Sequence, residues 1–362
     1  MRALLLSAYH ADSHRRWAEG VMRWLGRADW TLLDLPGRHF AWRMRGNPLT
    51  WHTSAAETLS REYDLILATS MVDLATLIGL YPNLGSARKL VYFHENQFAY
   101  PLSPRQKRHA EPLMVSIYSA LAADQLLFNS DHNLTTFMLG AREFLRRMPE
   151  RLDLSFIDAL EARSQVLPVP LEPLNEDVST SGQLPQRQLG LLLWNHRWEH
   201  DKNPDLFFAA CRELDRLDVP FQMAVAGQQF RQQPSVFDIA RDELAHRITH
   251  WGTLPRAEYR ELLTRASIVV STADHEFQGL AMLEAVQAGC VPLVPKRLCY
   301  PEFYATDYCY DGGLNDLVRR LSDWLPSPSR MPGLPEIDQW EWPVMLARYE
   351  HAIYDNPESE QD

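Results

Sequence analysis

The feature that most constrains the fold is a repeated alternation of short apolar runs with amphipathic stretches. In the first half, we predict strands at residues 3–7, 31–35, 64–69, 89–93, 125–129 and 165–169. Helical patterns lie between them, at residues 13–25, 72–80, 111–122, 131–139 and 155–162. This rhythm is typical of a parallel sheet flanked by helices.

A polar, proline-containing stretch at residues 172–188 interrupts the alternation and predicts a linker. Strands are then predicted at residues 189–194, 222–226, 247–250, 267–271 and 291–294. Helices are predicted at residues 204–217, 235–246, 256–265, 279–288 and 313–324. The sequence therefore predicts an α/β protein of two doubly wound, Rossmann-like domains, 1–171 and 189–335, facing an interdomain cleft at the carboxyl ends of their strands. We expect a last aromatic helix within 336–362 to cross back onto the first domain.

Charge and cysteine usage exclude several classes of protein. The net charge of −11 argues against a non-specific nucleic-acid coat and against electrostatic anchoring on anionic lipid, although it permits a local basic groove. The four cysteines contain no C-x-x-C pair, which favours reduced thiols over a disulfide framework. Because the amino-terminal apolar run is too short for a signal peptide and no run is long enough for a membrane span, we expect a cytoplasmic protein without membrane attachment.

The strongest motif is EFQGLAMLE, which runs from Glu276 to Glu284. We expect a helix to begin near Gly279, where a missing side chain allows close backbone approach and unpaired N–H groups suit a phosphate. The two glutamates would then reach opposite ends of one elongated ligand. The alternative is a surface loop followed by an ordinary helix with a solvated glutamate.

A second motif, WNHRWEHDKNP, follows the first strand of the second half. Arg197 and Lys202 are the cations that a diphosphate needs as its bond breaks. One alternative is solvated charge offset by Glu199 and Asp201. The other is a metal pair, His196 and His200, but no third ligand of suitable spacing is evident, so we expect no metal.

The order of motifs in the second half resembles the nucleotide-sugar half of retaining GT-B glycosyltransferases. The order is Arg-x4-Lys, then Ala226-Gly227, then Trp251-Gly252-Thr253-Leu254, then Glu-x7-Glu and Ala-Gly-Cys-Val-Pro. The resemblance implies that Arg197 and Lys202 hold the donor diphosphate, that Glu276 binds sugar hydroxyls and that Glu284 binds the ribose. It also implies a donor site with Gly227, Gly252, Thr253, Leu254, Gly279 and Leu280.

Polar clusters in the first half narrow the resemblance. Each follows a predicted strand: His10, Ser13 and His14; Ser70 and Asp73; His94, Glu95 and Asn96; Asn129 and Ser130. Together with their surroundings they resemble the tRNA-queuosine mannosyltransferase family, also called glycosyltransferase-like domain-containing proteins. The family implies transfer of mannose from GDP-mannose, as donor substrate, to the cyclopentene-diol of queuosine in a tRNA anticodon, with retention of configuration and without a cofactor.

Two of these clusters carry open interpretations. His94 stands at a strand end where related enzymes often have a histidine near the donor sugar, so we place it in the catalytic set with Glu276, Arg197 and Lys202; a buried structural histidine is the alternative. Many GT-B enzymes have a glycine-rich loop where this chain has His10, Ser13 and His14. Ser13 is equally a candidate N-cap for the following helix.

Acceptor recognition is predicted from three basic clusters. Residues 37–54, which we interpret as a long functional loop, interleave cations with aromatic rings: Arg38, His39, Trp42, Arg43, Arg45, Trp51 and His52. The others are Arg105, Lys107, Arg108 and His109, and Arg142, Arg146 and Arg147. Such residues suit the unstacked bases and phosphates of an RNA loop, whereas a solvated positive face is the alternative for each.

The sequence thus predicts a metal-independent hexosyltransferase that binds a nucleotide sugar and tRNA. Two alternatives stay open, namely a GT-B enzyme with a lipid or polysaccharide acceptor and a non-catalytic RNA- or nucleotide-binding module. If the donor assignment holds, Arg197→Ala or Lys202→Ala is expected to reduce turnover strongly and leave the fold intact.

Overall fold

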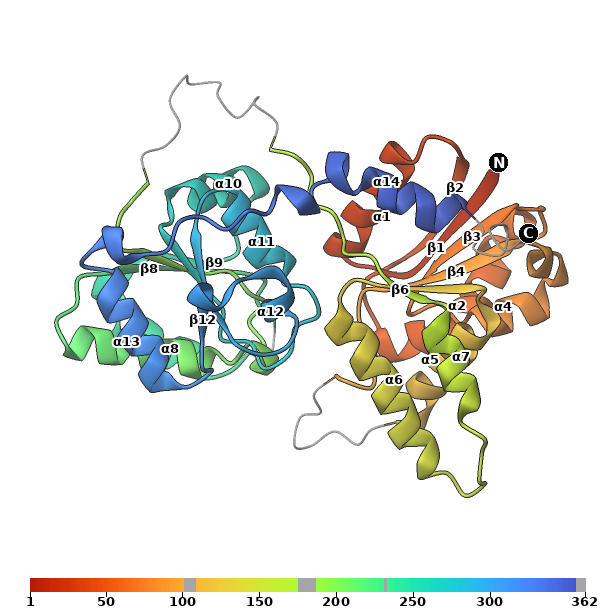
Figure 1. Ribbon diagram of the computed structural model, residues 1–362, viewed down its shortest axis with the longest axis horizontal. Helices are drawn as coiled ribbons and strands as arrows, with labels where there is room; N and C mark the ends of the chain where they lie inside the picture. The colour runs from red at the N-terminus through yellow and green to blue at the C-terminus, as the bar shows by residue number, and fades with distance from the viewer. Residues whose placement is uncertain (101–108, 175–186, 231–232, 356–362) are drawn as a thin grey trace. The chain divides into compact units, whose positions relative to one another are not determined.

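The computed structural model describes residues 1–100, 109–174, 187–230 and 233–355, which divide into two compact units. Unit 1 comprises Met1–Pro170 together with the carboxyl-terminal segment from Trp342, and unit 2 comprises Leu171–Glu341. Each unit holds, within these residues, one six-stranded sheet whose strands are all parallel (Figure 1). This confirms the predicted α/β class with two doubly wound sheets.

The sheet of unit 1 has the order β2-β1-β3-β4-β5-β6. Its strands are β1 (Arg2–His10), β2 (Asp29–Pro36), β3 (Leu65–Thr69), β4 (Arg88–Phe93), β5 (Gln125–Phe128) and β6 (Ser164–Val166). Its helices are α1 (Asp12–Trp24), α2 (Phe40–Ser54), α3 (Ala56–Leu59), α4 (Leu74–Leu80), α5 (Ala110–Ala122), α6 (Asp131–Arg146), α7 (Ser155–Ala162) and α14 (Trp342–Tyr354), with a short 3₁₀ helix at Pro82–Ser86.

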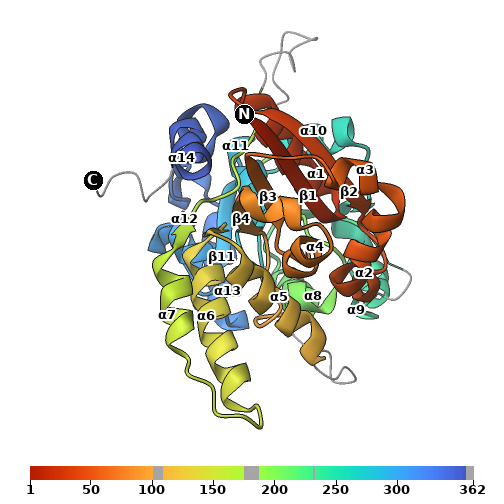
Figure 2. The same ribbon diagram turned by 90° about the vertical axis from the view of Figure 1, so that its right-hand side faces the viewer.

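Strand alternation in unit 1 creates two buried faces. Leu4, Leu6 and Ala8 of β1 join a core with residues of α2, α4, α5, α6 and α7. On the opposite face, Tyr92 of β4 packs against Trp17 of α1 and Tyr349 of α14. Figure 2 shows α6 and α7 side by side in this unit.

Unit 2 has the strand order β12-β11-β10-β7-β8-β9. Its strands are β7 (Leu191–Trp194), β8 (Gln222–Ala226), β9 (Ile248–Gly252), β10 (Ile268–Val270), β11 (Val291–Pro295) and β12 (Cys309–Tyr310). Its helices are α8 (Pro204–Arg216), α9 (Val236–Glu243), α10 (Arg256–Arg265), α11 (Leu280–Gln287), α12 (Tyr300–Phe303) and α13 (Leu314–Trp324). Short 3₁₀ helices lie at His200–Lys202, Ala245–Arg247, Thr306–Tyr308, Pro328–Arg330 and Asp338–Trp340.

The two faces of the unit 2 sheet are covered by different helices. Leu192 and Trp194 of β7 pack into a core with α8, α9 and α13. Leu191 and Leu193 pack into a second core with α10, α11 and α12. Because both faces are buried, the central strands read as continuous apolar runs, which is why the sequence located them.

Two local predictions are wrong. The expected loop at residues 37–54 is mostly helix α2, despite the internal Pro48. Ser13 is not an N-cap, because α1 begins at Asp12 and Ala11 occupies the capping position without a side-chain hydrogen bond. Twelve residues of the predicted linker, 175–186, lie outside the described residues, as do Arg105, Lys107 and Arg108. No helix in the described ranges is both long and apolar enough to cross a membrane.

Candidate active site

A buried lysine organises the first group of site residues, in unit 2. Lys202 ends the short helix that follows β7 and is 6% exposed. Its ammonium nitrogen lies 2.7 Å from the backbone oxygen of His275, 3.2 Å from Asp201 Oδ2 and 3.3 Å from Glu276 Oε2. His275 Nδ1 lies 3.7 Å from the same Asp201 oxygen. We call Lys202, Asp201, His275 and Glu276 the lysine cluster.

Backbone contacts hold the lysine cluster together. The backbone oxygen of Asp201 accepts hydrogen bonds from the N–H groups of Asp274 and His275, at 2.9 and 3.2 Å. The hydroxyl of Thr272 donates to the backbone oxygen of Lys202 at 2.9 Å. The loop after β7 is therefore fixed to the loop between β10 and α11, which brings Lys202 and Glu276 together as the sequence predicted for one site.

The charges of this cluster stabilise one another. Burial opposes ionisation of Glu276, but the Lys202 ammonium, the imidazoles of His196 and His275 and the backbone N–H of Phe277 together outweigh it and lower the pKa of Glu276 to about 2. Burial also disfavours the charged lysine, yet Glu276 and Asp201 raise the pKa of Lys202. Burial, assisted by the nearby Lys202, lowers the pKa of His196 to about 4. The cluster is thus a fixed cation between two carboxylates, with a neutral imidazole beside it at neutral pH.

Arg197 differs from Lys202 in its exposure. Its side chain is 46% exposed and pairs with Glu199 at 3.0 Å. It lies near enough to act electrostatically on Asp201 and Lys202. Arg197, Lys202 and Glu276 therefore lie in one region of unit 2, with the half-exposed guanidinium of Arg197 near the buried ammonium of Lys202.

The predicted donor-site glycines lie at strand and helix ends of the same unit. Gly227 follows β8, and its N–H donates to the backbone oxygen of Gly252 at 3.2 Å. A Cβ on Gly227 would lie 1.8 Å from the backbone oxygen of His196, so only glycine fits there. Gly252 ends β9 with φ of 110°, and the Thr253 hydroxyl donates to the backbone oxygen of Gly227 at 3.0 Å. Because His196 lies near Lys202, these contacts place Gly227, Gly252 and Thr253 close to the lysine cluster.

Helix α11 begins where the sequence predicted it. Gly279 is its N-cap with φ of 76°, Leu280 is its first residue, and Glu284 is half-buried further along it. Asn195, directly after β7, donates to the backbone oxygen of Ala281 at 2.8 Å. The amino end of α11 is therefore held beside the loop that carries Arg197 and Lys202. Leu254 packs against the core on the α10 and α11 face.

Two histidines and a glutamate form the centre of the unit 1 residues. We call His14, His94 and Glu95 the histidine cluster. The imidazole rings of His14 and His94 have centroids 4.2 Å apart, and Trp17 meets His94 edge-on at 4.7 Å. His14 Nδ1 lies 2.7 Å from the backbone oxygen of Tyr9, and Nε2 lies 3.3 Å from Glu95 Oε2. Both ring nitrogens thus face acceptors, which favours an imidazolium.

The pKa values of the two imidazoles are shifted in opposite directions. Burial alone would lower the pKa of His14, but the Glu95 carboxylate raises it. Burial, and then the neighbouring His14, lower the pKa of His94 well below its ordinary value. His94 Nε2 is buried, and among the described residues it has no hydrogen-bond partner. His94 is therefore a neutral imidazole with one unused nitrogen beside a buried ion pair.

The other predicted residues of unit 1 lie at the carboxyl ends of neighbouring strands. His10 ends β1, with Nδ1 2.9 Å from the Ser7 hydroxyl. Ser70 follows β3 and is buried, and its N–H donates to the backbone oxygen of Tyr92 at 2.9 Å. Asn129 donates to the backbone oxygen of His94 at 2.9 Å.

Three of the predicted polar residues accept hydrogen bonds from backbone N–H groups of nearby residues. Ser130 is the N-cap of α6, and Asp73 is the N-cap of α4. The side-chain oxygen of Asn96 accepts from the N–H groups of Phe98 and Ala99, both at 3.0 Å. Ser130 and Asn96 therefore shape the loops around the histidine cluster, whereas Asp73 lies in a separate pocket with Arg45.

Two members of the lysine cluster escaped the sequence prediction. Asp201 was interpreted as an offset to solvated charge, but its side chain is only 8% exposed. His275 precedes Glu276 directly and carried no signal of its own. Adjacency to Lys202 and Glu276 was the only available clue, because burial cannot be inferred from one sequence. Among the described residues, no group of three or more His, Cys, Asp or Glu side chains is arranged to hold a metal.

Comparisons with known proteins identify the fold and the class of protein. Residues 184–325 match the family model described as glycosyl transferases group 1. The fold resembles sucrose-phosphate synthase from Thermosynechococcus elongatus, with a TM-score of 0.68, 13% identity, and 97% of this chain and 98% of that one covered. It also resembles HepE from Anabaena, solved with UDP and glucose, with a TM-score of 0.67, 13% identity, and 98% and 100% coverage. The two parallel sheets and the match of residues 184–325 to this family model define a GT-B glycosyltransferase.

A narrower assignment comes from the first half of the chain. Residues 2–171 match the model described as tRNA-queuosine alpha-mannosyltransferase N-terminal. The chain is 33% identical over 332 residues to a tRNA-queuosine alpha-mannosyltransferase of Drosophila melanogaster, covering 90% of this chain and 87% of the relative. The chain belongs to the tRNA-queuosine alpha-mannosyltransferase family. This assignment confirms the predicted resemblance and the enzyme class, and it disfavours the non-catalytic alternative.

Proposed function

We propose that the protein transfers mannose from GDP-mannose to the queuosine of a tRNA anticodon, with retention of configuration. The relative from Drosophila melanogaster supports the reaction by its name and by its match to 90% of the chain. The lysine cluster is the structural observation that carries the donor half of the proposal. Its buried cation lies beside the amino end of α11, where negative phosphate charge is stabilised.

Donor binding is proposed to rearrange the ion pairs of Lys202. An ammonium has three N–H donors, and those of Lys202 face Asp201, Glu276 and the backbone oxygen of His275. A diphosphate oxygen would replace the Glu276 carboxylate, which then becomes an acceptor for sugar hydroxyls. Arg197, on the surface, would close onto the other phosphate, and both cations would stabilise the charge that grows as the nucleoside diphosphate leaves.

Proton transfer is proposed to involve the donor itself. In a front-face reaction with retention, the departing phosphate takes the proton of the attacking hydroxyl. His94, as a neutral imidazole with an unused buried nitrogen, would orient the sugar as a hydrogen-bond partner. Because two cationic side chains meet the phosphate charge, we propose that the transfer needs neither a metal nor another cofactor. We further propose a cytoplasmic site of action, in keeping with four free cysteine thiols and a tRNA acceptor.

The test incubates the protein with GDP-mannose and either queuosine-containing tRNA or the same tRNA lacking queuosine. Digestion to nucleosides and mass spectrometry should detect mannosyl-queuosine only with the first tRNA. A parallel set replaces GDP-mannose with UDP-sugars, and another adds EDTA. Equal labelling of both tRNAs would reject queuosine as the acceptor, preference for a UDP-sugar would reject the donor, and loss of turnover with EDTA would reject metal independence.

A further inference from the structure

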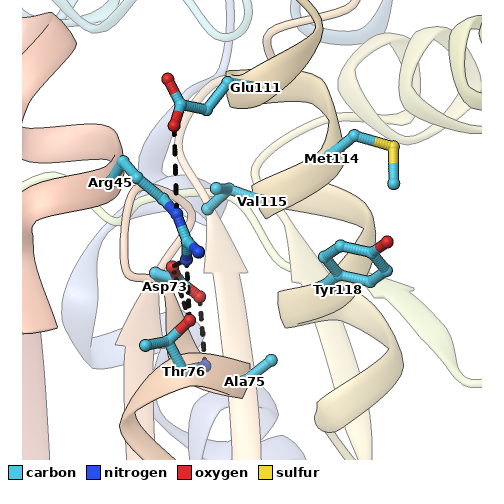
Figure 3. Close-up of a pocket in the computed structure, with 8 residues that line it drawn as sticks. All are labelled: Arg45, Asp73, Ala75, Thr76, Glu111, Met114, Val115 and Tyr118. Atoms are coloured by element: carbon cyan, nitrogen blue, oxygen red, sulfur yellow. Dashed lines mark hydrogen bonds and ion pairs between the residues drawn. The ribbon is translucent and has the colours of Figure 1, made fainter.

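A surface pocket of about 360 Å³ lies within unit 1, apart from the histidine cluster. It lies between α2, α4 and α5, and its lining includes Arg45, Asp73, Thr76, Glu111, Met114 and Tyr118 (Figure 3). Glu111, Met114 and Tyr118 are spaced three and four residues apart, which puts them along one face of α5. The pocket lies at the end of the unit where β3 ends and α4 and α5 begin.

One arginine connects the walls of this pocket. Arg45 forms an ion pair with Asp73 through Nη1, and the same nitrogen donates to the Thr76 hydroxyl at 2.8 Å. Arg45 Nε lies 4.0 Å from Glu111 Oε1. Asp73 also accepts from the backbone N–H of Thr76 at 3.1 Å and from its hydroxyl at 2.9 Å. The Asp73 carboxylate is thus occupied by Arg45 and Thr76, whereas the Glu111 carboxylate makes only a long contact with Arg45 (Figure 3).

Three exposed side chains of the lining suit a nucleobase, namely those of Glu111, Tyr118 and Arg45. The Glu111 side chain is 64% exposed, and Tyr118 is 50% exposed. A tyrosine ring and a guanidinium plane both stack on bases, and a carboxylate accepts the two adjacent N–H groups of a guanine-type edge. The volume falls at the lower end of the range for small-ligand sites, roughly 300–1,000 Å³, and so suits one base rather than a larger ligand.

The segment that contains α2 lacks acidic residues in an otherwise acidic protein. Between Asp34 and Glu57 the chain contains no acidic residue, but it contains Arg38, Arg43 and Arg45. Trp42, one turn before Arg45, is 53% exposed, and its indole lies across Gly46, where a Cβ would approach within 2.4 Å. Of these arginines, Arg43 is buried and Arg45 pairs with Asp73, whereas Arg38, which precedes α2, is exposed. In the third predicted basic cluster, Arg142 pairs with Asp158 and Arg147 with Glu143. Because residues 35–56 carry no acidic side chain of their own and Arg38 is exposed, charge favours RNA beside α2.

We propose that this pocket binds one unstacked purine of the acceptor RNA, with Glu111 accepting from its guanine-type edge and Tyr118 stacking on its face. The inference rests on the proposed tRNA acceptor, because the base of queuosine keeps that edge of guanine. It adds a base-recognition site formed by α2, α4 and α5.

The test measures KM for queuosine-containing tRNA at saturating GDP-mannose. Glu111→Gln removes one acceptor and presents an NH₂ group to the base, so KM should rise about 10–100-fold. Tyr118→Ala should raise KM about 10-fold or more, whereas Tyr118→Phe keeps the stacking ring and should stay close to wild type. Leu121→Ala is the matched control, since Leu121 is also exposed on α5 but does not line the pocket.

The outcomes separate this inference from the proposed function. If the wild type mannosylates the tRNA but Glu111→Gln and Tyr118→Ala keep the wild-type KM, the pocket assignment is wrong and the function stands. If Leu121→Ala raises KM as much as Tyr118→Ala, the effect belongs to α5 in general and the assignment is again wrong. A wild type that does not use the tRNA refutes the proposed function itself. Binding of the wild type, but not of Tyr118→Ala, to anionic lipid vesicles in place of tRNA would assign the pocket to a lipid.

Discussion

Lys202 and Arg197 share a proposed ligand but differ in what surrounds them. Lys202→Ala would leave the buried carboxylate of Asp201 and the partly buried carboxylate of Glu276 without their cation, which costs about 3–5 kcal/mol of folding free energy. Arg197→Ala removes one half-exposed pair with Glu199 and should cost at most about 1 kcal/mol. We therefore revise the expectation that either variant leaves the fold intact. We now expect an intact fold for Arg197→Ala alone.

Both variants should lose sugar transfer by about 100-fold or more, because each removes a cation from the departing diphosphate. Urea unfolding reports the stability difference, and initial rates with GDP-mannose report the activity. Near-native turnover of Arg197→Ala would contradict the donor assignment of that residue. Lys202→Ala with wild-type stability would contradict the buried ion pairs.

His196 makes the stability of unit 2 sensitive to mild acid. Its folded pKa of about 4 lies below the ordinary 6.5, so the unfolded chain binds a proton before the folded one does. The stabilising contribution is complete above pH 6.5 and is lost as pH falls toward 4, by on the order of 3 kcal/mol. Urea unfolding at about pH 7.5 and about pH 5 should show a smaller loss for His196→Gln than for wild type. Equal losses would show that His196 does not cause the effect.

The sequence predicted two residues of the lysine cluster, Lys202 and Glu276, but not the other two. Lys202 and Glu276 belong to spaced motifs that carry chemistry, and the structure brings them within 3.3 Å. Asp201 and His275 follow no spacing rule, because their role depends on burial between two loops that are far apart in sequence. The histidine cluster shows the same limit. Each residue was predicted near the end of a strand. The contact between His14 and Glu95 depends on the tertiary structure, so the sequence could not predict it.

Helix α2 shows where pattern recognition failed for a whole element. Its buried positions include Met44, Asn47, Pro48 and Trp51, which follow helical spacing. The apolar stripe was hidden because one of these four residues is a polar amide and another is a proline, which usually ends helices. Asn47 is buried because its amide donates to the backbone oxygens of Arg43 and Met71. Central strands such as β7 were easier, since an unbroken apolar run needs no tertiary information to be recognised.

The junction between β8 and the loop after β7 depends on one missing side chain. Gly227→Ala would push a methyl group into the backbone oxygen of His196, which lies 1.8 Å from the ideal Cβ position. Since the backbone must move, we expect a loss of about 3 kcal/mol or more, together with loss of sugar transfer. Gly79→Ala is the control, because no atom lies within 4 Å of its Cβ and it lies inside α4. That variant should be neutral or more stable by up to about 1 kcal/mol. Thermal unfolding that ranks the two variants in the opposite order would contradict the packing at Gly227.

The two units depend differently on the ends of the chain, because unit 1 contains the carboxyl-terminal helix and unit 2 does not. Unit 2 is one continuous segment, Leu171–Glu341, whereas unit 1 needs both the first 170 residues and α14. In α14, the Tyr349 hydroxyl accepts from Trp17 Nε1 at 3.1 Å and donates to the backbone oxygen of Pro168 at 3.0 Å. Trp342 packs so closely on α1 that a Cβ on Gly20 would lie 2.7 Å from its ring. The last helix therefore completes the core around α1.

Ending the chain after Glu341 should consequently unfold unit 1 and spare unit 2. The truncation uncovers Trp17 and Tyr92, which are buried in the full chain, and leaves the Trp17 N–H without its acceptor. Hydrogen exchange should show β1, β3 and β4 losing protection while β7 and β8 keep theirs, because the cores of unit 2 contain no residue of α14. A chain that ends after Asp355 retains α14 and should exchange like the full-length protein. Full protection of β1 in the shorter chain would show that α14 contributes little to unit 1, and uniform loss in both units would show that they fold as one.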